Sequence, residues 1–136
     1  MRVLVTAASK LDATGHIART IGEVLRSRGL AATVARPEDV RRIDRYDAVV
    51  VGSAVYSGQW LRPARRFVAR AGAALNGRPV WTFSASPHGE PSAPAVNGMR
   101  TRGHSVFARS AVDDASRAAS TWANEIADAL SASAAA

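Results

Sequence analysis

The sequence predicts an α/β fold in which helices cover both faces of a five-stranded parallel sheet. Strand-like apolar runs alternate with helical patterns along the 136 residues, which is typical of this fold class. The apolar run at 48–51 has no polar alternation, as expected for a strand covered on both faces. The length suits one domain and we find neither repeats nor a linker, so we expect a single domain over 1–136.

The first strand, turn and helix open the chain. The apolar run Val3–Val5 predicts a strand, and small or hydroxylated residues lead from it into a helix over 14–28. Gly29 ends this helix, a short strand follows at 31–35, and Pro37 begins a helical turn. The buried stripe of the helix recurs at helical spacing and consists of Ile17, Ile21, Val24 and Leu25.

The middle of the chain supplies the predicted central strand at 46–52 and a loop at 53–60. A helix is predicted over 62–75, where apolar residues again recur at helical spacing. The next strand, at 79–84, begins with a proline, which the first position of a strand tolerates. This strand leads into a further loop at 85–91.

The last third of the chain is less regular at its start. Residues 92–102 contain few large apolar side chains and predict at most a short helix. A brief strand is predicted at 103–108, and a helix over 113–130 starts with two aspartates that suit the positive end of its dipole. We expect residues 131–136 to be a frayed tail.

The composition excludes several kinds of chemistry. The chain lacks cysteine, which excludes disulfides, thiolate nucleophiles and thiolate-ligated iron–sulfur clusters, so any redox role requires a bound organic cofactor. No apolar run approaches the roughly 20 residues of a membrane span. The N-terminus lacks the basic and apolar segments of a secretory signal. We therefore expect a cytoplasmic protein without a transmembrane segment.

The net charge of +7 has two interpretations. Either the arginines form an ordinary solvated surface, which we favour, or they attract an anionic partner. In the second case a peripheral contact with acidic lipid, or with a polycarboxylate, would use arginines of one predicted helix: Arg62, Arg65, Arg66 and Arg70. We do not expect nucleic acid as a partner.

The first loop after a predicted strand has the composition of a phosphate site. Ligands of open α/β sheets bind at the carboxyl ends of the strands, and a helix N-terminus there offers free backbone N–H groups. Ser9, Lys10, Ala13 and Thr14 add two hydroxyls and the only lysine of the chain. The loop has neither a dinucleotide nor a P-loop motif. The alternative is that Ser9 and Thr14 only cap the helix.

The other two loops contain groups that suit a flat ring. Tyr56 and Trp60 flank Gly58, and aromatic faces beside a flexible backbone form a slot for stacking. The alternative is that Trp60 only anchors the following helix to the sheet. The loop at 86–89 offers hydrogen bonds to a ring edge, although a histidine such as His88 is more often a surface residue.

Three stretches, at 3–18, 46–67 and 79–89, together resemble the flavodoxin-like proteins. They include Val-Leu-Val-Thr-Ala-Ala-Ser-Lys from residue 3 and Ser-Ala-Val-Tyr-Ser-Gly-Gln-Trp from residue 53. Within that group the chain is most similar to the branch of menaquinone-dependent protoporphyrinogen oxidases. The resemblance implies a flavodoxin-like three-layer sandwich with strand order 2-1-3-4-5, and one non-covalently bound FMN.

The resemblance also implies which residues bind the cofactor. Those around the FMN phosphate would be Ser9, Lys10, Leu11, Asp12, Ala13 and Thr14. Those flanking the isoalloxazine ring would be Ala54, Val55, Tyr56, Ser57, Gly58 and Trp60. Those lining its other side would be Ser86, Pro87, His88 and Gly89.

The expected function is an FMN-dependent oxidoreductase that passes electrons or hydride, with a redox partner, a quinone or a porphyrinogen at the other end. The flavin supplies the chemistry, so we name no catalytic acid or base and no metal ligand. Three departures from the family pattern motivate the alternative of a flavodoxin-like module without flavin that acts as a binding or regulatory partner. They are Asp12 in place of glycine, Ala7 in place of an aromatic residue, and a short segment between Phe107 and Trp122.

Overall fold

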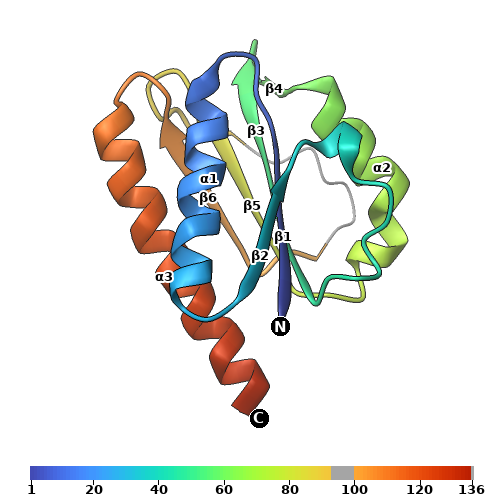
Figure 1. The fold of residues 1–136 in the computed structure, drawn as a ribbon. Coiled ribbons are helices and arrows are strands. Elements are labelled where there is room, and N and C mark those ends of the chain that lie inside the picture. Colours follow the sequence, from blue (N-terminus) through green and yellow to red (C-terminus); the bar gives the residue numbers. More distant parts are fainter. Residues whose placement is uncertain (93–99, 136) are drawn as a thin grey trace.

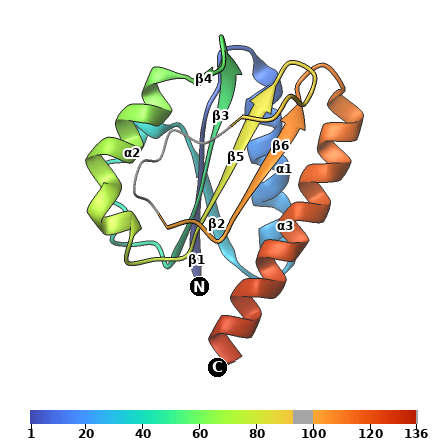
Figure 2. The same ribbon diagram turned by 180° about the vertical axis from the view of Figure 1, so that it is seen from behind.

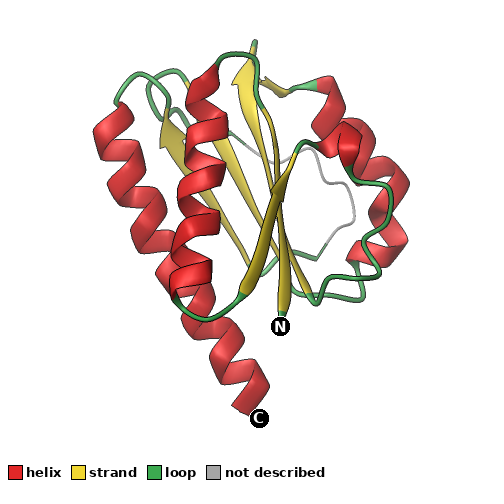
Figure 3. Ribbon diagram, viewed as in Figure 1, coloured by secondary structure: helices red, strands yellow, loops and turns green. Residues whose placement is uncertain are grey.

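The computed structural model describes residues 1–92 and 100–135, which form a sheet with helices on both faces (Figures 1 and 3). In chain order the elements are β1 (Arg2–Ala8), α1 (Asp12–Ser27), β2 (Ala31–Ala35), the 3₁₀ helix η1 (Pro37–Asp39), β3 (Ala48–Tyr56), β4 (Gln59–Trp60), α2 (Arg62–Leu75), β5 (Val80–Ser86), β6 (Gly103–Ala108) and α3 (Val112–Ala135). The helices α1 and α3 cover one face and α2 covers the other, as the reverse view in Figure 2 also shows.

The sheet has the order β2-β1-β3-β5-β6, and these five strands pair in parallel. The predicted fold class is therefore confirmed, and so is the 2-1-3-4-5 order when the five long strands are counted. The short β4 is additional and pairs antiparallel with the end of β3.

Two apolar cores flank the sheet, and β1 contributes to both. Val3 and Val5 belong to the core beneath α1 and α3, whereas Leu4 belongs to the core beneath α2. All three side chains are fully buried. Both faces of β1 are therefore covered, which explains why the run Val3–Val5 has no polar alternation.

A close packing contact joins β3 to β5 on the α3 side. Phe83 packs edge-to-face against Phe107, with ring centroids 5.7 Å apart, and against Trp122 at 6.1 Å. Gly52 is the register partner of Phe83, and a Cβ built on Gly52 would lie 2.2 Å from the Phe83 ring. The absence of a side chain at Gly52 is therefore what lets the ring lie over β3.

Two predicted boundaries were wrong at the carboxyl ends of strands. We expected β3 to end at residue 52 and a loop to occupy 53–60, but β3 continues to Tyr56 and forms a hairpin with β4. The turn consists of Ser57 (φ 52°) and Gly58 (φ 73°), and a two-residue hairpin favours this pair of left-handed conformations. β5 likewise continues through Ser86, two residues further than predicted.

The helix ends also differ from the prediction. α1 begins at Asp12 rather than at residue 14. α3 extends to Ala135, so the expectation of a frayed tail was wrong for 131–135. This segment contains only serine and alanine, and alanine is the strongest helix former, so nothing in it stops the helix. Residues 93–99, within the segment predicted as at most a short helix, and residue 136 lie outside the described residues.

Candidate functional site

The three predicted loops lie at the same edge of the sheet. The register pairs Ala8, at the end of β1, with Ser53 of β3, and it pairs Ala54 with Ala85 of β5. The chain therefore leaves β1, β3 and β5 side by side at the upper edge in Figure 1. This is the edge at which open α/β sheets bind their ligands.

The N-terminus of α1 has no side-chain cap. Leu11 occupies the N-cap position and makes no capping hydrogen bond, while the Ser9 hydroxyl donates to the Leu11 carbonyl. The buried Thr14 Oγ1 has no hydrogen-bond partner among residues 1–92 and 100–135. The alternative that Ser9 and Thr14 cap the helix is therefore not what the structure shows. The first turn therefore has no side-chain cap on its backbone N–H groups, and the Thr14 hydroxyl beside them is buried without a partner among the described residues.

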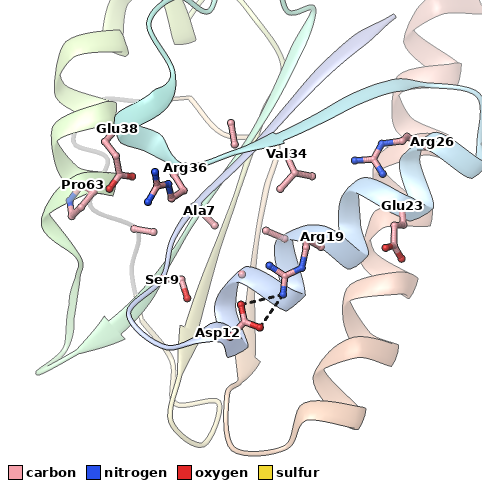
Figure 4. A pocket seen from close by; sticks show the side chains of 14 residues that line it. Ala7, Ser9, Asp12, Arg19, Glu23, Arg26, Val34, Arg36, Glu38 and Pro63 are labelled. Carbon is pink, nitrogen blue, oxygen red and sulfur yellow. Dashed lines mark hydrogen bonds and ion pairs between the residues drawn. The ribbon is translucent and has the colours of Figure 1, made fainter.

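Asp12, the residue that departs from the family pattern, pairs with a cation. One of its carboxylate oxygens lies 3.1 Å from Arg19 Nη2, and its side chain is 87% exposed. Figure 4 shows the two side chains joined along α1, seven residues or about two helical turns apart. The carboxylate therefore lies in solvent against a guanidinium, which reduces its repulsion of an anion at the helix N-terminus.

The two aromatic residues of the second loop do not form one slot. Trp60 is only 2% exposed, and its Nε1–H donates to Ser84 Oγ at 2.8 Å. It belongs to the same core as Phe67 of α2, as the anchoring alternative predicts. Tyr56 is half-buried and carries two cations on its ring: Lys10 Nζ lies 5.0 Å from the ring centroid and the Arg109 guanidinium lies 4.3 Å from it.

The third loop is held by its own hydrogen bonds. Ser86 Oγ donates to the Glu90 carbonyl at 2.9 Å, and the His88 backbone N–H donates to the Glu90 carboxylate at 2.9 Å. This N–H bond holds the pKa of the Glu90 carboxyl below its ordinary value. The exposed His88 ring lies 3.1 Å from Ser110 Oγ, and Gly89 has φ 80°. A fixed loop with an ionised carboxylate therefore borders the site.

The sequence interpretation missed Arg109, which bridges the carboxyl ends of β3 and β5. Its Nη1 donates to the carbonyl of Val55 at 2.7 Å and to that of Ala85 at 2.5 Å. It also lines a small hollow together with Ala13 of α1. The signal was available, because residue 109 directly follows the carboxyl end of β6, the end of a strand that the ligand rule also covers.

A second hollow, of about 550 Å³, lies on the other side of the first loop (Figure 4). Its floor includes alanines of β1, α1 and β2, and its rim carries three arginines and three acids: Arg19, Arg26, Arg36, Asp12, Glu23 and Glu38. The formal charges of this rim balance. The sequence interpretation did not name it, although it borders the carboxyl ends of β1 and β2.

His104 of β6 belongs to a polar network with residues of β5 and of the segment after it. Its Nδ1 lies 2.8 Å from Thr82 Oγ1, and its Nε2 lies 2.9 Å from the Ser92 carbonyl oxygen. Because a carbonyl only accepts, Nε2 carries the hydrogen and the neutral ring accepts at Nδ1. Burial lowers the pKa of His104 below its usual 6.5.

This histidine gives stability a pH dependence. The folded chain binds fewer protons than the unfolded chain between the lowered pKa and 6.5, so the stabilisation is complete above pH 6.5 and is lost as the pH falls through the folded pKa. We expect urea denaturation to give a lower free energy of unfolding at about pH 5 than at about pH 7.5, and His104→Gln to reduce this difference. His88→Gln, at an exposed histidine, is the matched control. An unchanged pH dependence in His104→Gln would contradict the assignment.

No helix in the described part of the chain combines the length and apolar character needed to cross a bilayer.

Comparisons with known proteins agree with the geometry. Residues 4–112 match a family model described as a flavodoxin domain, whereas no curated protein matches the sequence. A flavodoxin from the domain Archaea superposes with a TM-score of 0.77 at 18% identity, over 96% of this chain and 99% of that one. A flavodoxin from Streptococcus pneumoniae gives 0.74 at 20% identity, over 94% and 99%.

A larger protein contains the same fold as one part. Rubredoxin oxygen:oxidoreductase from Desulfovibrio gigas superposes with a TM-score of 0.72 at 19% identity, over 99% of this chain but 37% of that one. At identities this low, the superpositions show a shared fold.

Proposed function

The chain belongs to the flavodoxin-domain family, and from that premise we propose that it binds one FMN non-covalently and acts as a redox protein. The observation that carries the proposal is the uncapped N-terminus of α1, with the unpartnered Thr14 hydroxyl beside it. A phosphate supplies both the acceptor that this hydroxyl lacks and the negative charge that the helix dipole favours.

The residues at the first loop fit a phosphate in charge as well as in hydrogen bonding. The exposed Lys10 makes no ion pair with the described residues. Its ammonium lies over the Tyr56 ring at 5.0 Å from the centroid, and an anion would bind it more strongly than this exposed ring contact does. Asp12, the main objection to such a site, is paired with Arg19 and turned into solvent. Residues 9–14 would therefore hold the phosphate through backbone N–H groups, one ammonium and hydroxyls.

The second and third loops would hold the flavin ring. Residues 54–58 include the half-buried ring of Tyr56, and residues 86–89 form a loop fixed by internal hydrogen bonds. Trp60 would support this region from the core rather than stack on the flavin, because it is buried. Bound FMN supplies electron or hydride transfer, and the surrounding residues set access and charge.

We further propose a cytoplasmic protein whose counterpart is a redox partner protein or a quinone-like molecule. The matching family model is described only as a flavodoxin domain, and this description does not name the protoporphyrinogen oxidase branch. The connection from β6 to α3 consists only of residues 109–111. A connection this short adds little surface for a porphyrinogen beside the site, and this favours the simpler redox role.

FMN binding is the direct test. We expect the purified apoprotein to quench FMN fluorescence saturably at one FMN per chain and to shift the flavin absorption bands. The melting temperature should rise with FMN concentration, because a ligand of the folded state stabilises it by mass action. Lys10→Met, which keeps the chain length but removes the charge, should weaken FMN binding by about tenfold, since a charge-assisted hydrogen bond is lost.

Riboflavin is the matched control because it lacks the phosphate. Lys10→Met should leave riboflavin binding unchanged while it weakens FMN binding. If wild-type protein neither quenches FMN fluorescence nor changes its melting temperature with FMN, the chain is the module without flavin, and the FMN proposal fails.

A further inference from the structure

We propose, resting on the FMN function above, that Arg109 is the residue that recognises the polar edge of the flavin ring. The guanidinium lies between the two loops that would flank the ring. It is anchored by Nη1 to the strand-end carbonyls of Val55 and Ala85. Arg109 is therefore fixed at the end of β6 and contacts two loops that are far apart from each other in the sequence.

Two of the three guanidinium nitrogens of Arg109 are uncommitted in the described part of the chain. Only Nη1 of the guanidinium hydrogen-bonds to the described residues, and Nε and Nη2 make no hydrogen bond to residues 1–92 or 100–135. These two nitrogens form a planar fork suited to two neighbouring acceptor atoms. The pyrimidine edge of a flavin presents such acceptors, namely carbonyl oxygens beside ring nitrogens.

The charge of Arg109 is also uncompensated. Every ion pair between described residues lies elsewhere, and none involves Arg109 or Lys10. Both cations instead approach the ring of Tyr56, at 4.3 Å and 5.0 Å from its centroid. A half-buried cation without a carboxylate partner is stabilised by any acceptor that enters the site. Without a ligand, the guanidinium lies over the ring face of Tyr56 and is stabilised by a cation–π interaction.

Lys10 and Arg109 would bind different parts of the ligand. Lys10 lies in the loop at the N-terminus of α1, where the phosphate would bind, whereas Arg109 is bonded to the carboxyl ends of β3 and β5, where the ring would lie. Removing the Lys10 ammonium should therefore weaken the binding only of ligands that carry a phosphate. Removing the Arg109 guanidinium should weaken the binding of every ligand that carries the flavin ring.

The test measures dissociation constants of FMN and of riboflavin by fluorescence quenching. We expect Arg109→Gln to raise the dissociation constants of both ligands by about tenfold, because charge-assisted hydrogen bonds to the ring are lost. Lys10→Met should weaken FMN alone. Arg117→Gln, at an exposed arginine of α3 that pairs with Asp114, should change neither constant and is the matched control.

Arg109→Lys is the control for a loss of structure in the two loops that Arg109 anchors. Lysine keeps the positive charge and one bond to the strand-end carbonyls but lacks the planar fork. We expect this variant to melt near the wild-type temperature and still to bind riboflavin severalfold more weakly than wild type. If wild-type protein binds neither flavin, the FMN function fails. If it binds both, and Arg109→Gln and Arg109→Lys bind riboflavin as tightly as wild type or more tightly, the role of Arg109 alone is overturned.

Discussion

Gly52→Ala is expected to lower the free energy of unfolding by about 3 kcal/mol, the upper range for overpacking a well-packed core. The added methyl group would lie 2.2 Å from the ring of Phe83. That ring is fully buried and held by Phe107 and Trp122, so it has no free space to move into. Urea denaturation of the variant and of wild type measures the difference.

Gly72→Ala is the matched control because it makes the same chemical change in the helix α2. A Cβ there has no atom within 4 Å, and alanine favours a helix over glycine by about 0.5–1 kcal/mol. We expect this variant to be more stable than wild type. Adding Phe83→Leu to Gly52→Ala should cost less than the sum of the two single changes, since the smaller side chain removes the clash. A Gly52→Ala variant as stable as wild type would contradict the contact.

Trp60→Ala is the second substitution with a large expected effect, a loss of about 4 kcal/mol in the free energy of unfolding. The side chain is almost fully buried beside α2 and donates its only N–H to Ser84. Alanine leaves a cavity and removes that donor. Trp60→Phe keeps most of the apolar volume and should lose only about 1–2 kcal/mol.

Trp60→Phe and Tyr56→Ala together separate packing from ligand contact. Because Trp60 lies in the core, we expect Trp60→Phe to leave the dissociation constant of FMN unchanged, while Tyr56→Ala weakens it. Fluorescence titration with FMN measures both. A tenfold weaker FMN affinity in a Trp60→Phe protein of near wild-type stability would show that this indole contacts the flavin.

The fold was predictable from the sequence because its strongest signals are local. Val3–Val5 and the run at 48–51 are apolar on both faces of their strands, and each is followed by a helical pattern. The boundaries at Tyr56 and Ala135 were less predictable. The first depends on the hairpin turn at Ser57 and Gly58, and the second depends on a tail without any residue that stops a helix.

The candidate site was only partly predictable. The sequence predicted a helix N-terminus at the first loop, but hydroxyls at Ser9 and Thr14 suit a cap and a phosphate equally well. Only the hydrogen bonds of the folded chain show that neither residue caps the helix. The spacing of Tyr56 and Trp60 likewise says nothing about which ring is buried. Arg109 has no local motif, since its position depends on the pairing of β6 with β5.

The position of Lys10 has a practical consequence for labelling. It is the only lysine of the chain, its side chain is exposed, and its ammonium lies 5.0 Å from the centroid of the Tyr56 ring. A reagent specific for lysine side chains therefore has one target in this sequence, and that target lies just beyond the carboxyl end of β1. A dye or crosslinker on Lys10 therefore reports from the edge of the sheet where β1 ends, which is the edge that carries the candidate site.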